Sequence, residues 1–335
     1  MLRSFINRHI FLSFWLLAFV IGFAAIALMS VPYDINEVMG ALDEAQKVLN
    51  LNYFSIFLSI VVAKTYPILI LAIFFPAAPT AAALIMCAYR GGKRGVLNLL
   101  SRYKPWRAGV TAKEGITLYA VLLFAEIMVT FALIALAGVN HGATEVDRII
   151  GFLRLDAPLV FFGLFLLATT TEMGAFYEEL GWRGYGYPVL VGRMGSPLKA
   201  AVVLGVFWAV WHFPREIPFL LEGAPIGQLL VEQADFLLGS VSLTILIVYF
   251  VNRLGGSIIP AILIHGWSNY IGDATSGAGG ELWHPFDAFS IVKILIAVVI
   301  VVLAGSSLGR RQPGDGGIVD PVLEGRETDQ REPSE

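Results

Sequence analysis

Charge is scarce in this sequence of 335 residues. Only 15% of the residues are charged, whereas 57% are hydrophobic, and the mean hydropathy is +0.73. Soluble domains contain about 25% charged and about 45–50% apolar residues, so a water-soluble globular protein is excluded. The 23 Lys and Arg residues are balanced by 26 Asp and Glu residues. No excess of cations is left to form a nucleic-acid-binding surface, and we expect no nucleic-acid partner.

Cysteine is nearly absent as well. The single residue of this type, Cys87, lies inside an apolar block, which excludes a disulfide framework and any cysteine-based zinc site. The motif H-E-x-x-H does not occur, and G-x-S-x-G occurs only as GSSLG at 305–309, at the end of an apolar block rather than between a strand and a helix, where a serine nucleophile of this motif stands. The sequence therefore supports neither a serine nor a cysteine nucleophile.

What the sequence has in abundance is long apolar blocks. A helix needs about 20 mostly apolar residues to cross the hydrocarbon core of a bilayer. Blocks that reach or approach this length lie at 10–31, 116–138, 158–177, 200–213, 236–252, 257–271 and 288–308. The region 51–90 contains Lys64 and three prolines, and we expect it to cross once as a kinked helix, with an interfacial lead-in at 51–64. The sequence thus predicts an all-α polytopic bundle of about eight spans.

The distribution of cations predicts the orientation of this bundle. Segment 90–107 contains six Lys and Arg residues and no acid, which is typical of a cytoplasmic loop. Arg3 and Arg8 place the N-terminus on the same side, and we expect block 10–31 to be the first span rather than a removed signal peptide. The acidic loops 32–52, 214–235 and 272–287 then lie outside. We expect an integral protein of a prokaryotic inner membrane, in contact with lipid, with both termini cytoplasmic.

The last residues differ in composition from the rest. Residues 309–335 are polar and rich in Pro and Gly, and they hold 4 cations and 7 acids. Such a composition is typical of a disordered segment. We therefore predict an integral-membrane helical domain over 1–308 and a disordered cytoplasmic tail over 309–335.

Ionisable side chains inside the apolar blocks are the candidates for function, because a charge in hydrocarbon costs several kcal/mol. The polar residues found there are Lys64, Glu126, Glu172, Glu178, Glu179, His212, His265 and Asn269. For Lys64 and Glu126, which stand alone in their blocks, we favour a structural role. Glu172 shares a helix face with Glu179, and we favour a supporting contact for it.

The adjacent glutamates differ in their helical neighbours. Glu179 and Arg183 are separated by four positions and share one helix face, so Arg183 can neutralise Glu179. Glu178 points about 100° away from that face. We therefore expect Glu178 to be available for another task.

Two histidines stand in separate apolar blocks, each with a companion four positions away. Trp208 pairs with His212, and His265 pairs with Asn269. Counted from the nearest cytoplasmic cation, each histidine lies about 18–20 Å into the membrane at a rise of 1.5 Å per residue. We therefore predict a cavity within the membrane that contains the glutamates and both histidines.

These residue types fit the hydrolysis of an amide bond. A carboxylate and an imidazole can hold a water molecule and take its proton, and a second imidazole with a carboxamide can donate to an oxygen that becomes negative. The same side chains also fit a divalent metal such as zinc, with Glu178, His212 and His265 as the ligands. At this point both ways of activating water remain open, and no cofactor is assigned.

In chain order these residues read E-E-x-x-x-R, then H, then H-x-x-x-N. This order resembles the CPBP family, which contains type II CAAX prenyl proteases and bacteriocin-processing intramembrane proteases. The stretch EELGWRGYGYP is similar to the first family motif and GGSIIPAILIHGWSNYIG to the third. The resemblance covers residues 160–272 well, with a protease core at about 158–272. One position departs from the pattern, because Trp208 stands where the family usually has Phe.

The resemblance implies an endopeptidase that cleaves a membrane-associated peptide or (lipo)protein near the membrane surface. Glu178 would activate water with His212 as its partner, and Glu179 would be the supporting carboxylate. The other implied roles are oxyanion stabilisation by His265 and Asn269, and support from Arg183 and Trp208. The resemblance also leaves metal dependence open, although the absence of a further strong ligand favours water activated by glutamate.

Two other classes of protein fit part of the pattern. A non-catalytic scaffold or immunity protein could retain the fold and bind a partner. A proton-coupled transporter would also use buried Glu and His, but it would require inverted repeats with broken helices. The sequence shows neither feature.

Overall fold

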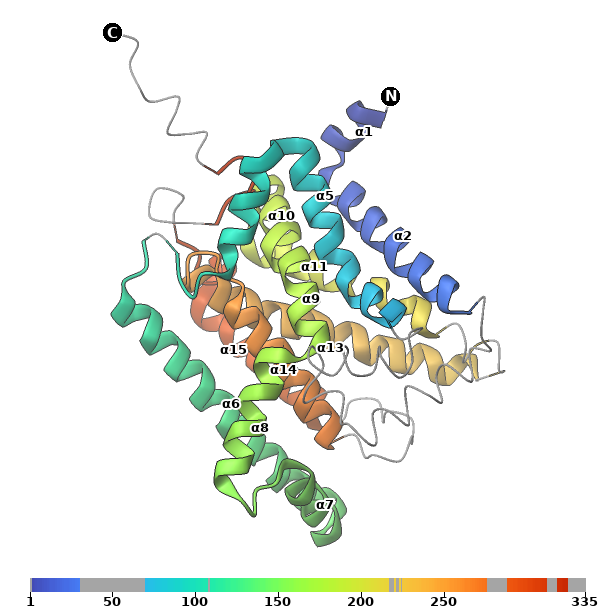
Figure 1. The fold of residues 1–335 in the computed structure, drawn as a ribbon. Helices are drawn as coiled ribbons and strands as arrows, with labels where there is room; N and C mark the ends of the chain where they lie inside the picture. The colour runs from blue at the N-terminus through green and yellow to red at the C-terminus, as the bar shows by residue number, and fades with distance from the viewer. Residues whose placement is uncertain are drawn as a thin grey trace.

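A computed structural model describes residues 2–30, 70–107, 109–216, 220, 223, 225–275, 288–311 and 318–324. All regular secondary structure in these ranges is helical, which confirms the predicted all-α class. Figure 1 shows the longer helices gathered into one bundle, with the N-terminal helix α1 and the segment 318–324 at the same end.

The first part of the bundle is a helix pair. Helix α1 (Leu2–Arg8) leads into α2 (Ile10–Ser30), which packs along α5 (Ile70–Leu100). Gly92 interrupts α5 with φ 55° and ψ −151°, a conformation that glycine adopts without steric cost. The helical path therefore turns inside the cation-rich segment that we expected to be a loop. Lys64 and the predicted lead-in at 51–64 lie outside the described residues.

Helix α6 (Ala112–His141) is followed by a short helix that the sequence did not predict. Helix α7 (Ala143–Leu153) forms where we expected only a loop, and it buries Ile149 and Leu153. These two residues are one helical turn apart, so their side chains form a single apolar stripe against the bundle.

The predicted span 158–177 is wrong as a single continuous helix. Helix α8 (Pro158–Thr171) ends at Glu172, whose backbone is extended, and α9 (Met173–Gly181) begins directly after it. The Glu172 carboxylate accepts hydrogen bonds from the backbone N–H groups of Gly174 and Ala175 at 3.0 and 2.7 Å. A side chain that caps a new helix in this way stabilises the break. The chain continues as a π-helical turn, η3 (Trp182–Gly186), and then as α10 (Tyr187–Met194).

Four further helices follow in the described part of the chain. They are α11 (Pro197–His212), α13 (Ile226–Arg253), α14 (Ile259–Thr275) and α15 (Ala288–Ala304). Helix α11 packs on α13, α13 packs on α14 and α15, and α14 packs on both α8 and α9. The halves of the broken helix therefore share α14 as a neighbour (Figure 1).

Close approaches at two glycines fix α9 and α14 in place. A Cβ atom at Gly181 would lie 2.3 Å from the carbonyl carbon of Pro79, and one at Gly266 would lie 2.6 Å from the carbonyl oxygen of Thr169. Only glycine fits at such separations. Helix α9 therefore lies directly against α5, and α14 lies directly against α8.

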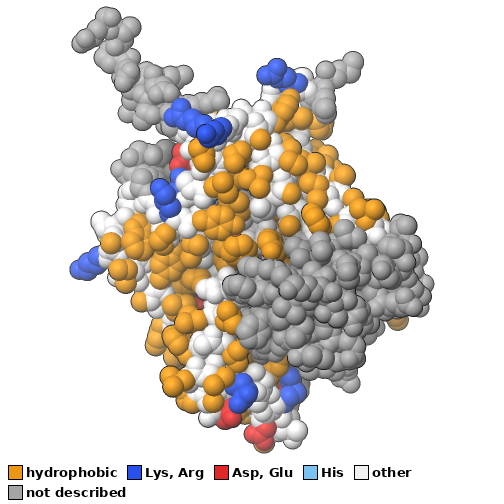
Figure 2. Space-filling view, viewed as in Figure 1, with side chains coloured by type: hydrophobic (Ala, Val, Ile, Leu, Met, Phe, Trp, Pro, Cys, Tyr) orange, Lys and Arg blue, Asp and Glu red, His pale blue; other side chains and the backbone are white. Residues whose placement is uncertain are grey.

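The outer surface agrees with a membrane location. Among the described residues, four helical stretches are long and apolar enough to cross a bilayer: Ala112–Val139, Pro158–Met194, Ile226–Arg253 and Phe289–Ser307. Ile10–Ala25 and Pro197–His212 are shorter apolar helices. In Figure 2 the described part of the visible face is largely hydrophobic, and charged side chains lie toward its top, left and bottom. The total of eight spans and the cytoplasmic location of the termini stay predictions.

One part of the chain differs from the expected disordered tail. Residues 318–324 pack against the helices and bury Ile318, Asp320 and Val322. The reason is that this polar region contains a short apolar segment whose side chains reach the main hydrophobic core.

Candidate active site

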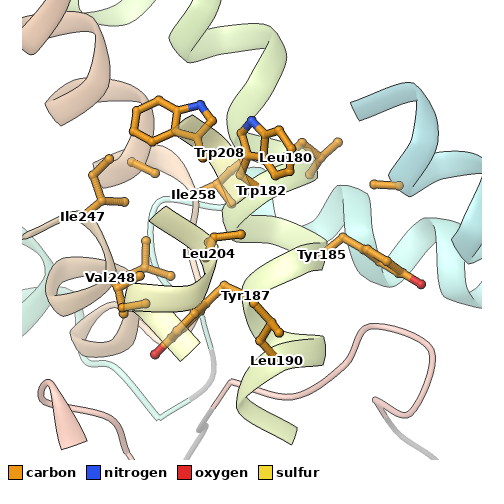
Figure 3. Close-up of a cluster of buried hydrophobic side chains, with 14 of the residues drawn as sticks. Leu180, Trp182, Tyr185, Tyr187, Leu190, Leu204, Trp208, Ile247, Val248 and Ile258 are labelled. Carbon is orange, nitrogen blue, oxygen red and sulfur yellow. The ribbon is translucent and has the colours of Figure 1, made fainter. Parts of the chain in front are cut away.

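Glu178 is held in place by two tryptophans. It lies in the last turn of α9, with only 4% of its surface exposed. Its Oε2 atom accepts hydrogen bonds from the indole nitrogens of Trp182, at 3.2 Å, and Trp208, at 2.8 Å. Figure 3 shows the nitrogen ends of the two indoles close together on one side of the buried cluster. One oxygen of Glu178 is therefore fixed by two neutral donors.

Glu179 has a different, charged partner. Its Oε1 atom accepts a hydrogen bond from Nη1 of Arg183 at 2.7 Å, and Nδ1 of His265 lies 2.9 Å from the same oxygen. The ion pair predicted from the four-residue spacing is therefore present, and both of its members are fully buried. Arg183 also donates to Oγ1 of Thr244 on α13 at 2.8 Å.

The two adjacent carboxylates are thus inequivalent. Glu179 is paired with a guanidinium group, and its role is to compensate a buried charge, which is costly without a partner. Glu178 has no hydrogen bond from Lys or Arg among the described residues. Its second oxygen, Oε1, faces Nε2 of His212 across 3.9 Å. Of the two carboxylates, Glu178 is therefore the one directed toward His212.

His212 is oriented by its own helix. Its Nδ1 atom lies 2.8 Å from the carbonyl oxygen of Trp208, and since a carbonyl only accepts, Nδ1 carries the proton. In the neutral ring Nε2 is then an acceptor, and it faces Glu178. A separation of 3.9 Å exceeds a direct hydrogen bond but suits a bridging water molecule. The imidazole is enclosed by Trp211 and Phe236, whose ring centroids lie 4.8 and 5.2 Å away.

Trp208 contacts Glu178, both histidines and Arg183. Its ring centroid lies 5.6 Å from that of His212 and 5.1 Å from that of His265. The guanidinium carbon of Arg183 lies 4.3 Å from the same ring. From the sequence we assigned this residue an aromatic supporting role only. Its indole N–H group, which Phe lacks, donates to Glu178. The sequence analysis did not predict this hydrogen bond.

His265 and Asn269 are placed differently within α14. The Nδ1 atom of His265 is directed to Glu179, so Nε2 is the ring nitrogen not engaged by that carboxylate. The Asn269 amide nitrogen lies 3.5 Å from the position that a Cβ atom would take at Gly174, close to Glu172. In the described part of the chain no hydrogen bond joins Asn269 to Glu178. The structure thus brings His265 to the glutamate pair and Asn269 to the beginning of α9.

Two side chains of the site were not among our candidates. Trp182 follows Glu178 by four positions, so the spacing rule that paired Glu179 with Arg183 would also have found it. Thr244 has no comparable signal, because it lies 61 positions from Arg183 on a helix that reads as ordinary apolar sequence.

The candidates outside the site have other surroundings. Glu172 caps α9 with its carboxylate, in agreement with a supporting contact. Glu126 is buried on α6 with 4% exposure, and neither of its carboxylate oxygens has a hydrogen-bond partner among the described residues. Lys64 lies outside those residues.

The sequence offered Glu178, His212 and His265 as possible metal ligands. Among the described residues, no group of three His, Cys, Asp or Glu side chains is placed to hold a metal ion. Of the ligands considered from the sequence, His265 directs Nδ1 to Glu179 rather than toward Glu178 and His212.

Comparison with known proteins places this site in a recognised family segment. Residues 158–271 match the family described as Type II CAAX prenyl endopeptidase Rce1-like. A stretch of 109 residues is 35% identical to a protein named CAAX prenyl protease 2 from Methanococcus maripaludis. It covers 32% of this chain and 37% of that relative, so the match spans little more than a third of the relative's length. The resemblance predicted from the three motifs is confirmed, and the matched range contains Glu178, His212 and Asn269.

Proposed function

We propose that this protein is an intramembrane endopeptidase that hydrolyses a peptide bond of a membrane-associated peptide or protein. The observation that carries the proposal is the geometry of Glu178. One of its oxygens is fixed by two indole N–H groups, and the other faces Nε2 of His212 across 3.9 Å. The family match over residues 158–271 supports the same activity.

In the proposed reaction a water molecule lies between Glu178 and His212. Glu178 takes one proton from the water as general base, and the water oxygen attacks the carbonyl carbon of the scissile bond. The C–N bond then breaks, and the leaving nitrogen receives the proton that Glu178 carried. His212 accepts the second hydrogen of the water in a hydrogen bond through Nε2, and this contact orients the attack.

The carbonyl oxygen becomes negative during this attack and needs a hydrogen-bond donor. We assign this role to His265 through Nε2, with Asn269 as the second donor. Since Nδ1 of His265 lies 2.9 Å from Glu179, the ring donates from both nitrogens only as an imidazolium. The role of Glu179 is therefore to stabilise that cation, while Arg183 is the second cationic partner of Glu179.

The same surroundings favour water activated by glutamate over water activated by a metal. Nδ1 of His265 is directed to Glu179 rather than toward Glu178 and His212. The broken helix at Glu172 is one feature of the transporter alternative, but an inverted repeat is not seen in the sequence. The endopeptidase therefore remains the better proposal.

A cleavage assay tests the proposal. The purified protein in detergent would be given quenched-fluorescent peptides, half of them carrying a prenylated cysteine near the C-terminus, because the relative is named a CAAX prenyl protease. We expect cleavage by the wild type and none by Glu178→Gln. Glu126→Gln is the matched control, since it makes the same change at a buried glutamate of another helix, and it should cleave normally. Equal cleavage by Glu178→Gln would contradict the proposal, and a folded wild type that cleaves no peptide would favour the scaffold alternative.

A further inference from the structure

The segment 318–324 lies in a groove that glycines line on one side. Val322 is 6% exposed and belongs to the main hydrophobic core. A Cβ atom at Gly91 would lie 3.2 Å from Val322 Cγ1, and one at Gly95 would lie 3.6 Å from Cγ2. A larger residue at Gly91 would press against the segment. Val322 therefore packs directly against the glycines of α5.

Two acids of the segment pair with three arginines of the cation-rich region. Asp320 accepts two hydrogen bonds from Arg90, at 3.3 and 2.8 Å. Glu324 forms ion pairs with Arg102, at 3.5 Å, and with Arg107. Bidentate arginine–carboxylate pairs are the stronger kind of charged hydrogen bond, and their geometry is specific.

The backbone of the segment is bound as well. Arg102, which is fully buried, donates to the carbonyl oxygen of Val319 at 2.6 Å. The Asn98 amide donates to the carbonyl oxygens of Pro321 and Glu324, both at 3.1 Å. Bonds to main-chain carbonyls select a backbone conformation rather than a side chain, which is typical of peptide recognition.

One of these arginines also reaches the candidate active site. Nη1 of Arg90 donates to the phenol oxygen of Tyr185 at 3.0 Å. Tyr185 is fully buried in η3, the π-helical turn that also contains Trp182 and Arg183. The same guanidinium group thus binds Asp320 on one side and, on the other, the turn that directly follows the helix of Glu178 and Glu179.

We propose that α5 and the turn η2 (Ser101–Tyr103) form a peptide-binding site, that residues 318–324 of the same chain occupy it, and that this occupancy positions η3 through Arg90 and Tyr185. The ligand of this site is an acidic peptide with two carboxylates four positions apart and an apolar side chain between them. Its effect on catalysis rests on the proposed function, whereas the binding does not.

The first experiment removes the segment and returns it as a separate molecule. The chain truncated after Gly317 would be titrated against a fluorescein-labelled peptide of residues 316–326, with anisotropy as the readout. We expect saturable binding to the truncated chain and little to the full chain, whose site is occupied. A peptide with Asp320→Asn should bind about tenfold more weakly, because it loses a bidentate charged contact. Equal binding of the two peptides would overturn the proposal.

A second measurement uses the full chain and does not depend on affinity. Cysteines would replace Gly91 and Val322 in a Cys87→Ser background. A Cβ atom at position 91 would lie 3.6 Å from Val322 Cα, which is close enough for a disulfide to form. Gly151→Cys with Val322→Cys is the matched control, because a Cβ atom at Gly151 has no neighbour within 4 Å. If a folded protein forms no more of the 91–322 disulfide than of the control, the segment does not occupy the groove.

The third measurement tests the positioning of η3. We expect Asp320→Asn to lower kcat about tenfold with little change in KM, because displaced catalytic groups slow the chemical step more than binding. Asp156→Asn, which alters an exposed ion pair with Arg154, should have no effect. Adding the 316–326 peptide should restore kcat to the truncated chain. Unchanged kcat in both altered chains would overturn the positioning role. Cleavage by no form, with binding and cross-linking intact, would instead contradict the proposed function.

Discussion

The indole nitrogen of Trp208 donates to Oε2 of Glu178 at 2.8 Å, although the two residues are 30 positions apart. This contact ties α11 to α9 and determines which carboxylate oxygen is directed toward His212. It also gives a physical meaning to the one departure from the family pattern. A phenylalanine at position 208 would fill much of the same space but would donate nothing.

Replacing Trp208 by Phe should therefore affect catalysis more than folding. We expect kcat to fall about tenfold, which corresponds to the loss of one hydrogen bond of about 1.4 kcal/mol to a charged acceptor. Thermal unfolding should change little, since the aromatic packing remains. Trp211→Phe is the matched control: its indole nitrogen, on the same helix, donates instead to the carbonyl oxygen of Ala18. If Trp211→Phe slows cleavage as much as Trp208→Phe does, the Trp208 N–H group has no special role.

The two glutamates should respond differently to the same substitution. Glu179→Gln leaves the Arg183 cation buried without a charged partner, so we expect a loss of about 3–5 kcal/mol in the free energy of unfolding. Glu178→Gln removes no ion pair with an arginine, so its stability should be near that of the wild type while its activity is lost. Denaturation in mixed micelles, followed by circular dichroism, compares the two. A Glu179→Gln variant as stable as Glu178→Gln would contradict the assignment of the buried pair.

Thr244 offers a test of a residue that the sequence did not reveal. Thr244→Val leaves Nη2 of Arg183 without its acceptor, and a buried unsatisfied donor costs about 1–3 kcal/mol. Thr244→Ser keeps the hydroxyl group and should retain wild-type stability. A loss of stability in Thr244→Val that is absent in Thr244→Ser would assign the effect to the hydrogen bond with Arg183. Equal destabilisation by both would mean that packing, and not the hydrogen bond, explains the effect.

The break at Glu172 predicts a loss of stability rather than a loss of chemistry. Removing the cap with Glu172→Ala should lower the free energy of unfolding by about 1 kcal/mol, with cleavage retained by the folded fraction. Thr111→Ala removes the side-chain cap of α6, where Thr111 accepts from the Glu114 N–H at 3.3 Å, and should have a similar or smaller effect. Complete loss of cleavage by a stable Glu172→Ala protein would instead place this carboxylate in the reaction.

Chelation distinguishes the two ways of activating water. We expect cleavage to persist after prolonged dialysis against a strong chelator, because Glu178 and His212 hold the water in the proposed reaction without a third ligand. A zinc-dependent protease of known activity, treated in parallel, shows that the chelator works. Loss of cleavage that returns on adding zinc would contradict activation by glutamate alone.

The predictions that the sequence made well concern neighbours on one helix. The spacing of Glu179 and Arg183 predicted their ion pair, and the long apolar blocks predicted the all-α membrane class. The sequence analysis predicted one continuous helix over 158–177, because a glutamate in an apolar block gives no sign that its carboxylate will cap a new helix. The burial of residues 318–324 was not predicted either. A short apolar segment in a polar region is buried only when the folded helices offer a surface that receives it.

The sequence by itself determined which residues share a helix face, because the 3.6-residue period of the α-helix fixes those neighbours locally. Only the tertiary structure decided that Trp208 reaches Glu178, that His265 reaches Glu179, and that Asp320 reaches Arg90 across 230 positions. The physical reason is that such contacts depend on how closely the helices approach and how each is rotated about its axis. Those quantities are set by packing at residues such as Gly181 and Gly266, whose importance no local pattern reveals.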